Sequence, residues 1–191
     1  KRISKKKNYI SFIGKLNRSK GYDLFAKAIM KILDEFPNWE AYSVGDEERR
    51  DLYISHKNHY ELGFLNHKKV LELLEKTSIS VVPSRWEEPF GRTALEASSR
   101  GCATIISNRG GLPETTNHAI ILKNLDYENL YKQIRYLIKN NKIRDQIQKD
   151  SFNNVQHIIS ANTKIIDKLR QESLPYSNFN FIKNKVKILN I

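Results

Sequence analysis

The fold is indicated by residues 8–36, which read NYISFIGKLNRSKGYDLFAKAIMKILDEF. Residues 8–13 are mostly β-branched and aromatic and stop at Gly14, as a buried strand does. Residues 22–36 carry apolar side chains at steps of three and four, and this stripe ends at Pro37. The sequence therefore predicts a strand, a loop bracketed by glycines, and a helix, in that order.

The same alternation continues along the chain. We expect strands at residues 39–44, 60–62, 79–82, 103–107 and 119–122, and helices at residues 68–76 and 92–100. Strands with little polar alternation, separated by helices, are typical of a parallel sheet covered on both faces. The predicted fold class is α/β, a doubly wound parallel sheet. Residues from 127 to about 172 look helical and complete a domain of residues 1–172, and residues 173–191 are expected to form a tail.

Composition and charge exclude some classes of protein. The 191 residues are 39% hydrophobic and 28% charged, which is a globular composition, and no apolar run reaches the roughly 18 residues that a membrane span needs. The net charge of +12 is concentrated at the two ends of the chain. Such a basic surface can attract nucleic acid, anionic lipid or phosphorylated ligands, and charge alone does not choose among them. The single cysteine, Cys102, is expected to be a buried side chain at the start of a strand.

Three further segments carry expectations. The chain opens with Lys1 and has no apolar leader, so we expect it to be a piece of a longer protein. The lysine run at residues 5–7 is interpreted as a solvated interdomain linker, with contact to an anionic membrane as the alternative. His56 and His59 are interpreted as surface-loop residues rather than metal ligands, because no cysteine or acidic cluster accompanies them.

In a doubly wound sheet, ligands bind beyond the carboxyl ends of the strands. The loop at this edge after the first strand is residues 14–21, GKLNRSKG, in which three basic side chains stand between two glycines ahead of a helix. A helix N-terminus offers free N–H groups, so this loop is a candidate phosphate receptor. It has neither the Walker spacing nor the GxGxxG fingerprint, and a solvated basic turn is the alternative.

The second motif is residues 88–96, EPFGRTALE, which has an acid at each end and seven residues between them. Pro89 keeps Glu88 out of helical geometry, and Gly91 allows close approach of a ligand before the helix begins. Amides near residues 91–93 would hold phosphate oxygens, while Glu88 and Glu96 accept hydrogen bonds from hydroxyls. This favours a sugar that bears phosphate, with ordinary solvated carboxylates as the alternative. Residues 109–114, RGGLPE, form a third motif whose bare amides are expected to face the crevice.

Together these pieces resemble the C-terminal, donor-binding domain of the group 1 glycosyltransferases (family 4), which have the two-domain GT-B fold. The resemblance covers residues 9–152 and consists of FIGKLNRSKG, LGFL, VVPSRWEEPFGRTALEA and SNRGGLPE, in the family's order and spacing. The form WEEPFGRT resembles lipopolysaccharide core mannosyltransferases more narrowly.

The resemblance implies a role for each matched residue. It places Lys15 and Lys20 at the diphosphate of a GDP- or UDP-linked sugar, although the family usually has Arg where this chain has Lys15. It places Glu88 at the transferred sugar and Glu96 at the ribose. The remaining expected contacts are backbone groups: Gly14 in the first loop, the amides of Phe90, Gly91 and Thr93 at the phosphates, and Gly63 and Phe64 at the base. Glu88 and Lys20 are the expected catalytic residues.

The resemblance also implies a reaction that retains the anomeric configuration, through an oxocarbenium-like state and without a metal or other cofactor. No Asp-x-Asp motif is present. The expected partners are a nucleotide-sugar donor, a saccharide or lipid-linked acceptor, and an N-terminal domain that this chain lacks, so the chain alone should bind donor but transfer little sugar. We expect a cytoplasmic protein, with peripheral contact at the inner face of the membrane as an option, and no nucleic-acid partner. The alternatives are a GT-B-type epimerase and a non-catalytic basic domain that binds nucleic acid or anionic surfaces.

Overall fold

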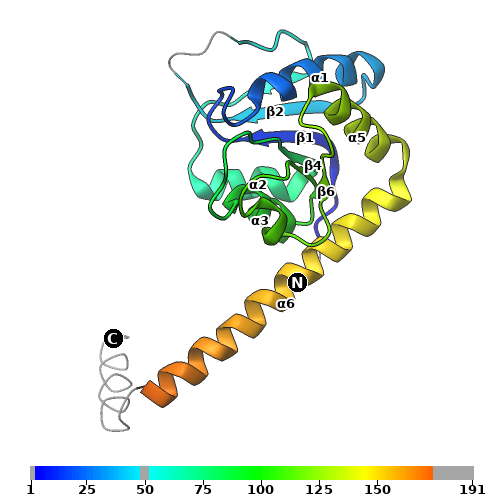
Figure 1. Cartoon of the computed structure of the whole chain (residues 1–191). Helices are drawn as coiled ribbons and strands as arrows, with labels where there is room; N and C mark the ends of the chain where they lie inside the picture. Colours follow the sequence, from blue (N-terminus) through cyan, green and yellow to red (C-terminus); the bar gives the residue numbers. More distant parts are fainter. Residues whose placement is uncertain (1–2, 48–51, 174–191) are drawn as a thin grey trace, which may run out of the picture. The chain divides into compact units, whose positions relative to one another are not determined.

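The computed structural model describes residues 3–47 and 52–173, and the chain divides into two units, Lys1–Val155 and Gln156–Ile191. In the first unit, six parallel strands form one sheet in the order β3-β2-β1-β4-β5-β6 (Figure 1). The strands are β1 (Lys7–Ile13), β2 (Glu40–Val44), β3 (His59–Glu61), β4 (Thr77–Val82), β5 (Ala103–Ile106) and β6 (Ile120–Ile121). The predicted α/β fold with a parallel sheet is thereby confirmed.

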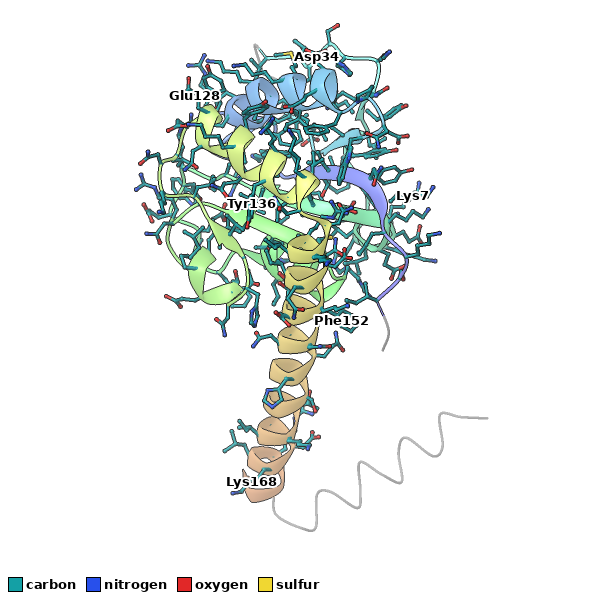
Figure 2. All side chains as sticks on the ribbon, turned by 90° about the vertical axis from the view of Figure 1, so that its right-hand side faces the viewer. Lys7, Asp34, Glu128, Tyr136, Phe152 and Lys168 are labelled. Atoms are coloured by element: carbon teal, nitrogen blue, oxygen red, sulfur yellow. The ribbon has the colours of Figure 1, made fainter. Side chains whose placement is uncertain are left out.

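Helices cover both faces of this sheet. Figure 1 shows α1 (Tyr22–Glu35) and α5 (Tyr127–Lys139) on one side, and α2 (His67–Lys76) and α3 (Arg92–Ser99) on the other. Figures 1 and 2 both show α1 and α5 side by side. Every residue of β4 is buried, as a central strand covered on both faces requires.

The strand order fixes where a ligand can enter. The chain leaves β1 toward β2 on one side, whereas β4 is its neighbour on the other side, so the order reverses between β1 and β4. In an open parallel sheet the crevice lies at this switch point, outside the carboxyl ends of the strands. The two loops at that point are residues 14–21 and 83–91.

The element boundaries differ from the predicted ones by one or two residues, and one helix was not expected. Residues 112–115 form the short helix α4 (Leu112–Thr115), which no periodic pattern in the sequence predicted. The last helix is α6 (Asn141–Ser173), whose side chains Gln148, Phe152 and Val155 are buried in the first unit; Figure 2 labels Phe152 on this helix. The predicted boundary at residue 172 stays a prediction, and the tail at residues 174–191 lies outside the described residues.

The linker interpretation of residues 5–7 is wrong for two of the three lysines. Lys7 is the first residue of β1. The ammonium of Lys6 donates hydrogen bonds to the carbonyl oxygens of Leu74, Glu75 and Arg100, at 3.0, 3.0 and 2.6 Å. Burial lowers the pKa of Lys6. This lysine therefore joins the ends of α2 and α3 and is not a solvated linker residue.

The histidine pair also departs in part from expectation. His59 lies on β3, and its Nε2 is 2.8 Å from Ser43 Oγ, so it is not a loop residue. Burial lowers the pKa of His59. Across residues 3–47 and 52–173, no group of three or more His, Cys, Asp or Glu side chains could hold a metal ion. No helix in these described ranges is both long and apolar enough to cross a membrane.

Candidate functional site

A pocket of about 280 Å³ lies at the switch point of the sheet. Its walls come from the ends of β1 and β4, from the two loops at that point, and from the first residues of α3. Six of the ten predicted site residues line it: Gly14, Lys20, Glu88, Phe90, Gly91 and Thr93. Two segments about 70 residues apart in the sequence thus form one concave surface.

Opposite charges meet inside this pocket. Lys20 Nζ lies 2.6 Å from Glu88 Oε1, and the two side chains are 31% and 15% exposed. An ion pair that is partly shielded from water is screened less than one at the surface. The pocket therefore presents a cation and a carboxylate side by side. The ammonium of Lys20 can bind an anionic group of a ligand, and the carboxylate of Glu88 can accept hydrogen bonds from a ligand.

The N-terminus of α3 forms the other wall. Gly91 is the N-cap residue with φ 70, and no side chain caps the helix. The first N–H groups of a helix have no partner within the helix, and they favour anions. Since Gly91, Arg92 and Thr93 line the pocket, this uncapped helix start faces the same space as Lys20.

Loop 14–21 is shaped by Asn17. Its Oδ1 accepts hydrogen bonds from Lys20 N at 3.1 Å and from Ser19 Oγ at 2.8 Å. Its Nδ2 donates to Glu47 Oε2 at 2.9 Å. Asn17 thus sets the position of Lys20, although it was not among the predicted site residues. Asn at such a turn position is a signal that could have been used.

Loop 83–91 rests on the glycine turn that follows β5. Gly111 N donates to Glu88 O at 2.6 Å, and Gly110 N donates to Glu87 Oε2 at 2.6 Å. The expectation that these amides face the crevice is therefore wrong, because the neighbouring loop occupies both of them. A side chain would not fit here either, since a Cβ on Gly110 would lie 2.3 Å from Glu88 O. The turn supports Glu88 from behind instead of binding a ligand directly.

The other four predicted residues lie outside the pocket lining. Glu96 is on α3, where its Oε1 is 3.3 Å from His67 Nε2 and 3.9 Å from Arg92 Nη2. Lys15 is exposed beside Gly14, and within the described parts of the chain its side chain has no hydrogen bond or ion pair. Gly63 and Phe64 follow β3, and the Phe64 ring is 78% exposed. Glu96 is linked to the pocket through Arg92, whereas Gly63 and Phe64 belong to a neighbouring strand end.

The comparisons with known proteins agree on one family. The family model described as "Glycosyl transferases group 1" matches residues 1–153. An uncharacterized glycosyltransferase of Methanocaldococcus jannaschii is 34% identical over 119 residues, which are 58% of this chain and 30% of that protein. Spore coat protein SA of Bacillus subtilis is 26% identical over 162 residues, which are 76% of this chain and 43% of that protein. The chain thus spans less than half the length of these two relatives.

Solved structures share the fold. The C-terminal domain of the group 1 glycosyl transferase LpcC from Francisella tularensis has a TM-score of 0.70 at 23% identity, covering 81% of this chain and 87% of that one. HepE from Anabaena, solved with UDP and glucose, has a TM-score of 0.70 at 18% identity, covering 88% and 49%. WaaG, described as a glycosyltransferase involved in lipopolysaccharide biosynthesis, has a TM-score of 0.68 at 19% identity, covering 81% and 44%.

Proposed function

The chain belongs to the group 1 glycosyltransferases, and on this premise we propose that it is the donor-binding domain of an enzyme that transfers a hexose from a nucleoside diphosphate sugar with retention of configuration. The observation that carries the proposal is the pairing of Lys20 with Glu88 beneath the uncapped N-terminus of α3. A sugar diphosphate needs both kinds of group, because its phosphates require cations or amides and its hydroxyls require acceptors.

In this proposal the pocket receives the diphosphate and the sugar. Its volume of about 280 Å³ lies just below the ~300–1,000 Å³ range of small-molecule sites, so a whole nucleotide sugar would extend beyond it. Lys20 and the amides of Gly91 and Thr93 bind the phosphates, with Phe90 and Gly14 contributing backbone. Lys15, which is exposed and follows the pocket residue Gly14, would turn toward the same diphosphate.

The chemistry follows from charge. As the glycosidic bond breaks, negative charge develops on the departing diphosphate, and a fixed cation with helix amides lowers the energy of that state without a metal ion. Glu88, released from Lys20 by the phosphate, accepts hydrogen bonds from the sugar hydroxyls and faces the positive, oxocarbenium-like centre. No metal or other cofactor enters this proposal.

The nucleoside lies toward Glu96 and the end of β3. A carboxylate one turn into α3 can accept hydrogen bonds from both ribose hydroxyls, in competition with its contacts to His67 and Arg92. Gly63 and Phe64 would bind the base. The solved neighbour HepE, which holds UDP and glucose, supports a nucleoside diphosphate sugar as donor.

The identity of the sugar and of the acceptor is part of the proposal. The WEEPFGRT form favours mannose, and the neighbour WaaG supports a saccharide or lipid-linked acceptor of the cell envelope. A further domain would supply the acceptor pocket. Such an enzyme would work in the cytoplasm or at the inner face of the membrane.

The proposal is tested by calorimetric titration of the chain with UDP and GDP. Lys20→Ala should weaken binding of the preferred nucleotide by about tenfold or more, because a charge-assisted hydrogen bond to phosphate is lost. Lys132→Ala, on the exposed side of α5, removes the same charge elsewhere and should leave the affinity unchanged. No binding of either nucleotide at millimolar concentration would refute the donor-binding role. An assay of sugar inversion without acceptor separates transferase from epimerase.

A further inference from the structure

A set of hydrogen bonds joins the two loops that carry Lys20 and Glu88. Arg85 Nη1 and Nη2 lie 2.6 and 2.9 Å from Asp23 Oδ1 and Oδ2, and Nη1 also donates to Arg18 O at 2.6 Å. The backbone N–H groups of Arg85 and Trp86 donate to Ser19 O at 2.8 and 3.1 Å. We call these contacts the Arg85 clamp. It ties loop 83–91 to loop 14–21 and to the first turn of α1.

The clamp residues are close in the sequence to the two residues of the ion pair. Lys20 follows Ser19 directly, and Glu88 follows Trp86 by two residues. The two backbones are also in direct contact, because a Cβ on Gly21 would lie 2.0 Å from Pro83 O. A change in the clamp would therefore shift Lys20 and Glu88 relative to each other.

Neither member of the clamp acts on a ligand in the pocket, since neither Arg85 nor Asp23 lines it. Their side chains are 38% and 19% exposed, and an ion pair this accessible contributes little to overall stability. A bidentate guanidinium–carboxylate pair does, however, fix orientation, because both nitrogen–oxygen contacts must be kept at once. The Arg85–Asp23 pair should therefore affect the relative positions of Lys20 and Glu88 more than the free energy of unfolding.

We propose that Arg85 is a positioning residue, which holds Lys20 and Glu88 at the separation that a diphosphate requires by binding Asp23 and the carbonyl groups of loop 14–21. This inference rests on the proposed function. Because it acts through Lys20, the clamp should matter for the diphosphate and not for the nucleoside. Loss of the clamp should lower the preference of the chain for the nucleoside diphosphate, UDP or GDP, over the matching nucleoside.

The test is a double-mutant cycle measured by calorimetry on the whole chain, with UDP and GDP and with their nucleosides uridine and guanosine. Arg85→Gln and Asp23→Asn should each weaken binding of the preferred nucleoside diphosphate by about tenfold, while the affinity for the matching nucleoside, uridine or guanosine, and the melting temperature stay close to those of the wild type. In the Lys20→Ala background, Arg85→Gln should cause no further loss. The matched control is Arg135→Gln, which breaks an ion pair with Glu35 near the other end of α1 and should leave nucleotide binding unchanged.

The outcomes separate this inference from the proposed function. If the wild type binds UDP or GDP and Arg85→Gln binds equally well, the inference is overturned and the donor-binding role stands. Losses that add up in the double variant, or an equal fall in affinity for the matching nucleoside, would also overturn it. If the wild type binds no nucleotide, the donor-binding role fails. The clamp is then judged by hydrogen exchange at the Arg85 and Trp86 amides, where unchanged protection in Asp23→Asn would refute it.

Discussion

Gly45 lies where the ends of two strands touch. Its φ is 134, and a Cβ placed on it would lie 1.9 Å from Gly14 O, whereas a Cβ on Gly63 at φ 61 would meet nothing within 4 Å. Gly45→Ala should therefore destabilise the chain by about 3 kcal/mol, through strain and collision, and Gly63→Ala by about 1 kcal/mol, through strain alone. Urea unfolding measures both. Equal losses would show that the contact with Gly14 relaxes freely.

Cys102 offers a test of pH dependence. The side chain is fully buried, its Sγ donates to Leu74 O at 3.3 Å, and burial raises the pKa of the thiol to about 11. In the unfolded chain the thiol has a pKa of about 8.5, so the folded chain holds the proton more tightly. This part of the stability is fully present below pH ~8.5 and is lost as the pH rises toward 11.

Comparison of the wild type with Cys102→Ala isolates this effect. Lys6, whose pKa burial lowers, works in the opposite direction in both proteins, and only in the wild type does the charge of Cys102 counteract that lowering. Urea unfolding between pH 8 and 10.5 should show a steeper fall for the wild type than for the variant. A thiol reagent should react with native Cys102 only as fast as the chain opens. Rapid labelling at pH 8 would contradict the burial of this side chain.

Sequence reasoning selected Lys20 and Glu88 and missed the residues that position them. A charge between glycines, or an acid beside Pro89, stands out locally, because glycine permits turn conformations that other residues avoid and proline keeps the residue before it out of a helix. Asn17 binds Ser19 and Lys20 within its own loop, and it was missed although its turn position is a local signal. Arg85 and Glu87 act on groups that are distant in sequence; Arg85 and Asp23, for example, are 62 residues apart. Only the fold brings such partners together.

At the scale of elements, the sheet was predictable because buried parallel strands have a strong apolar signal. The four residues of α4 gave no periodic pattern, and Pro113 in a glycine-rich stretch is equally typical of a turn. The lysine run at residues 5–7 was misinterpreted because its composition gives a clear signal that does not hold for Lys6. Lysine is nearly always exposed, so composition could not reveal that Lys6 is partly buried and bonded to three carbonyl groups.

Lys6 should accordingly stabilise two helices at once. Its ammonium bonds carbonyls in the last turn of α2 and at the C-cap of α3, where a positive charge also complements the helix dipole. Lys6→Met keeps the volume and leaves these carbonyls without the donor, so it should lower the free energy of unfolding by about 2 kcal/mol or more. Lys5→Met changes an exposed neighbour and should stay within about 0.5 kcal/mol. Similar losses in both variants would contradict the capping role.

At the scale of the whole molecule, the net charge of +12 and the crevice predict different kinds of binding. Contact between a basic surface and duplex DNA releases counterions, so with about six phosphate contacts the affinity should fall about a thousandfold between 50 and 200 mM salt. A nucleoside diphosphate held by Lys20 and helix amides displaces far fewer counterions. Its affinity should fall by about tenfold or less over the same range.

Two variants distinguish binding to the basic surface from binding in the crevice. Lys20→Ala should remove most of the UDP or GDP affinity and change DNA binding by no more than one phosphate contact, whereas Lys132→Ala should affect DNA alone. Fluorescence titrations at several salt concentrations measure both ligands under the same conditions. If nucleotide binding instead follows the steep slope of DNA and is indifferent to Lys20, the pocket is not a specific site. The surface charge would then explain all binding, and the alternative of a non-catalytic basic domain would be correct.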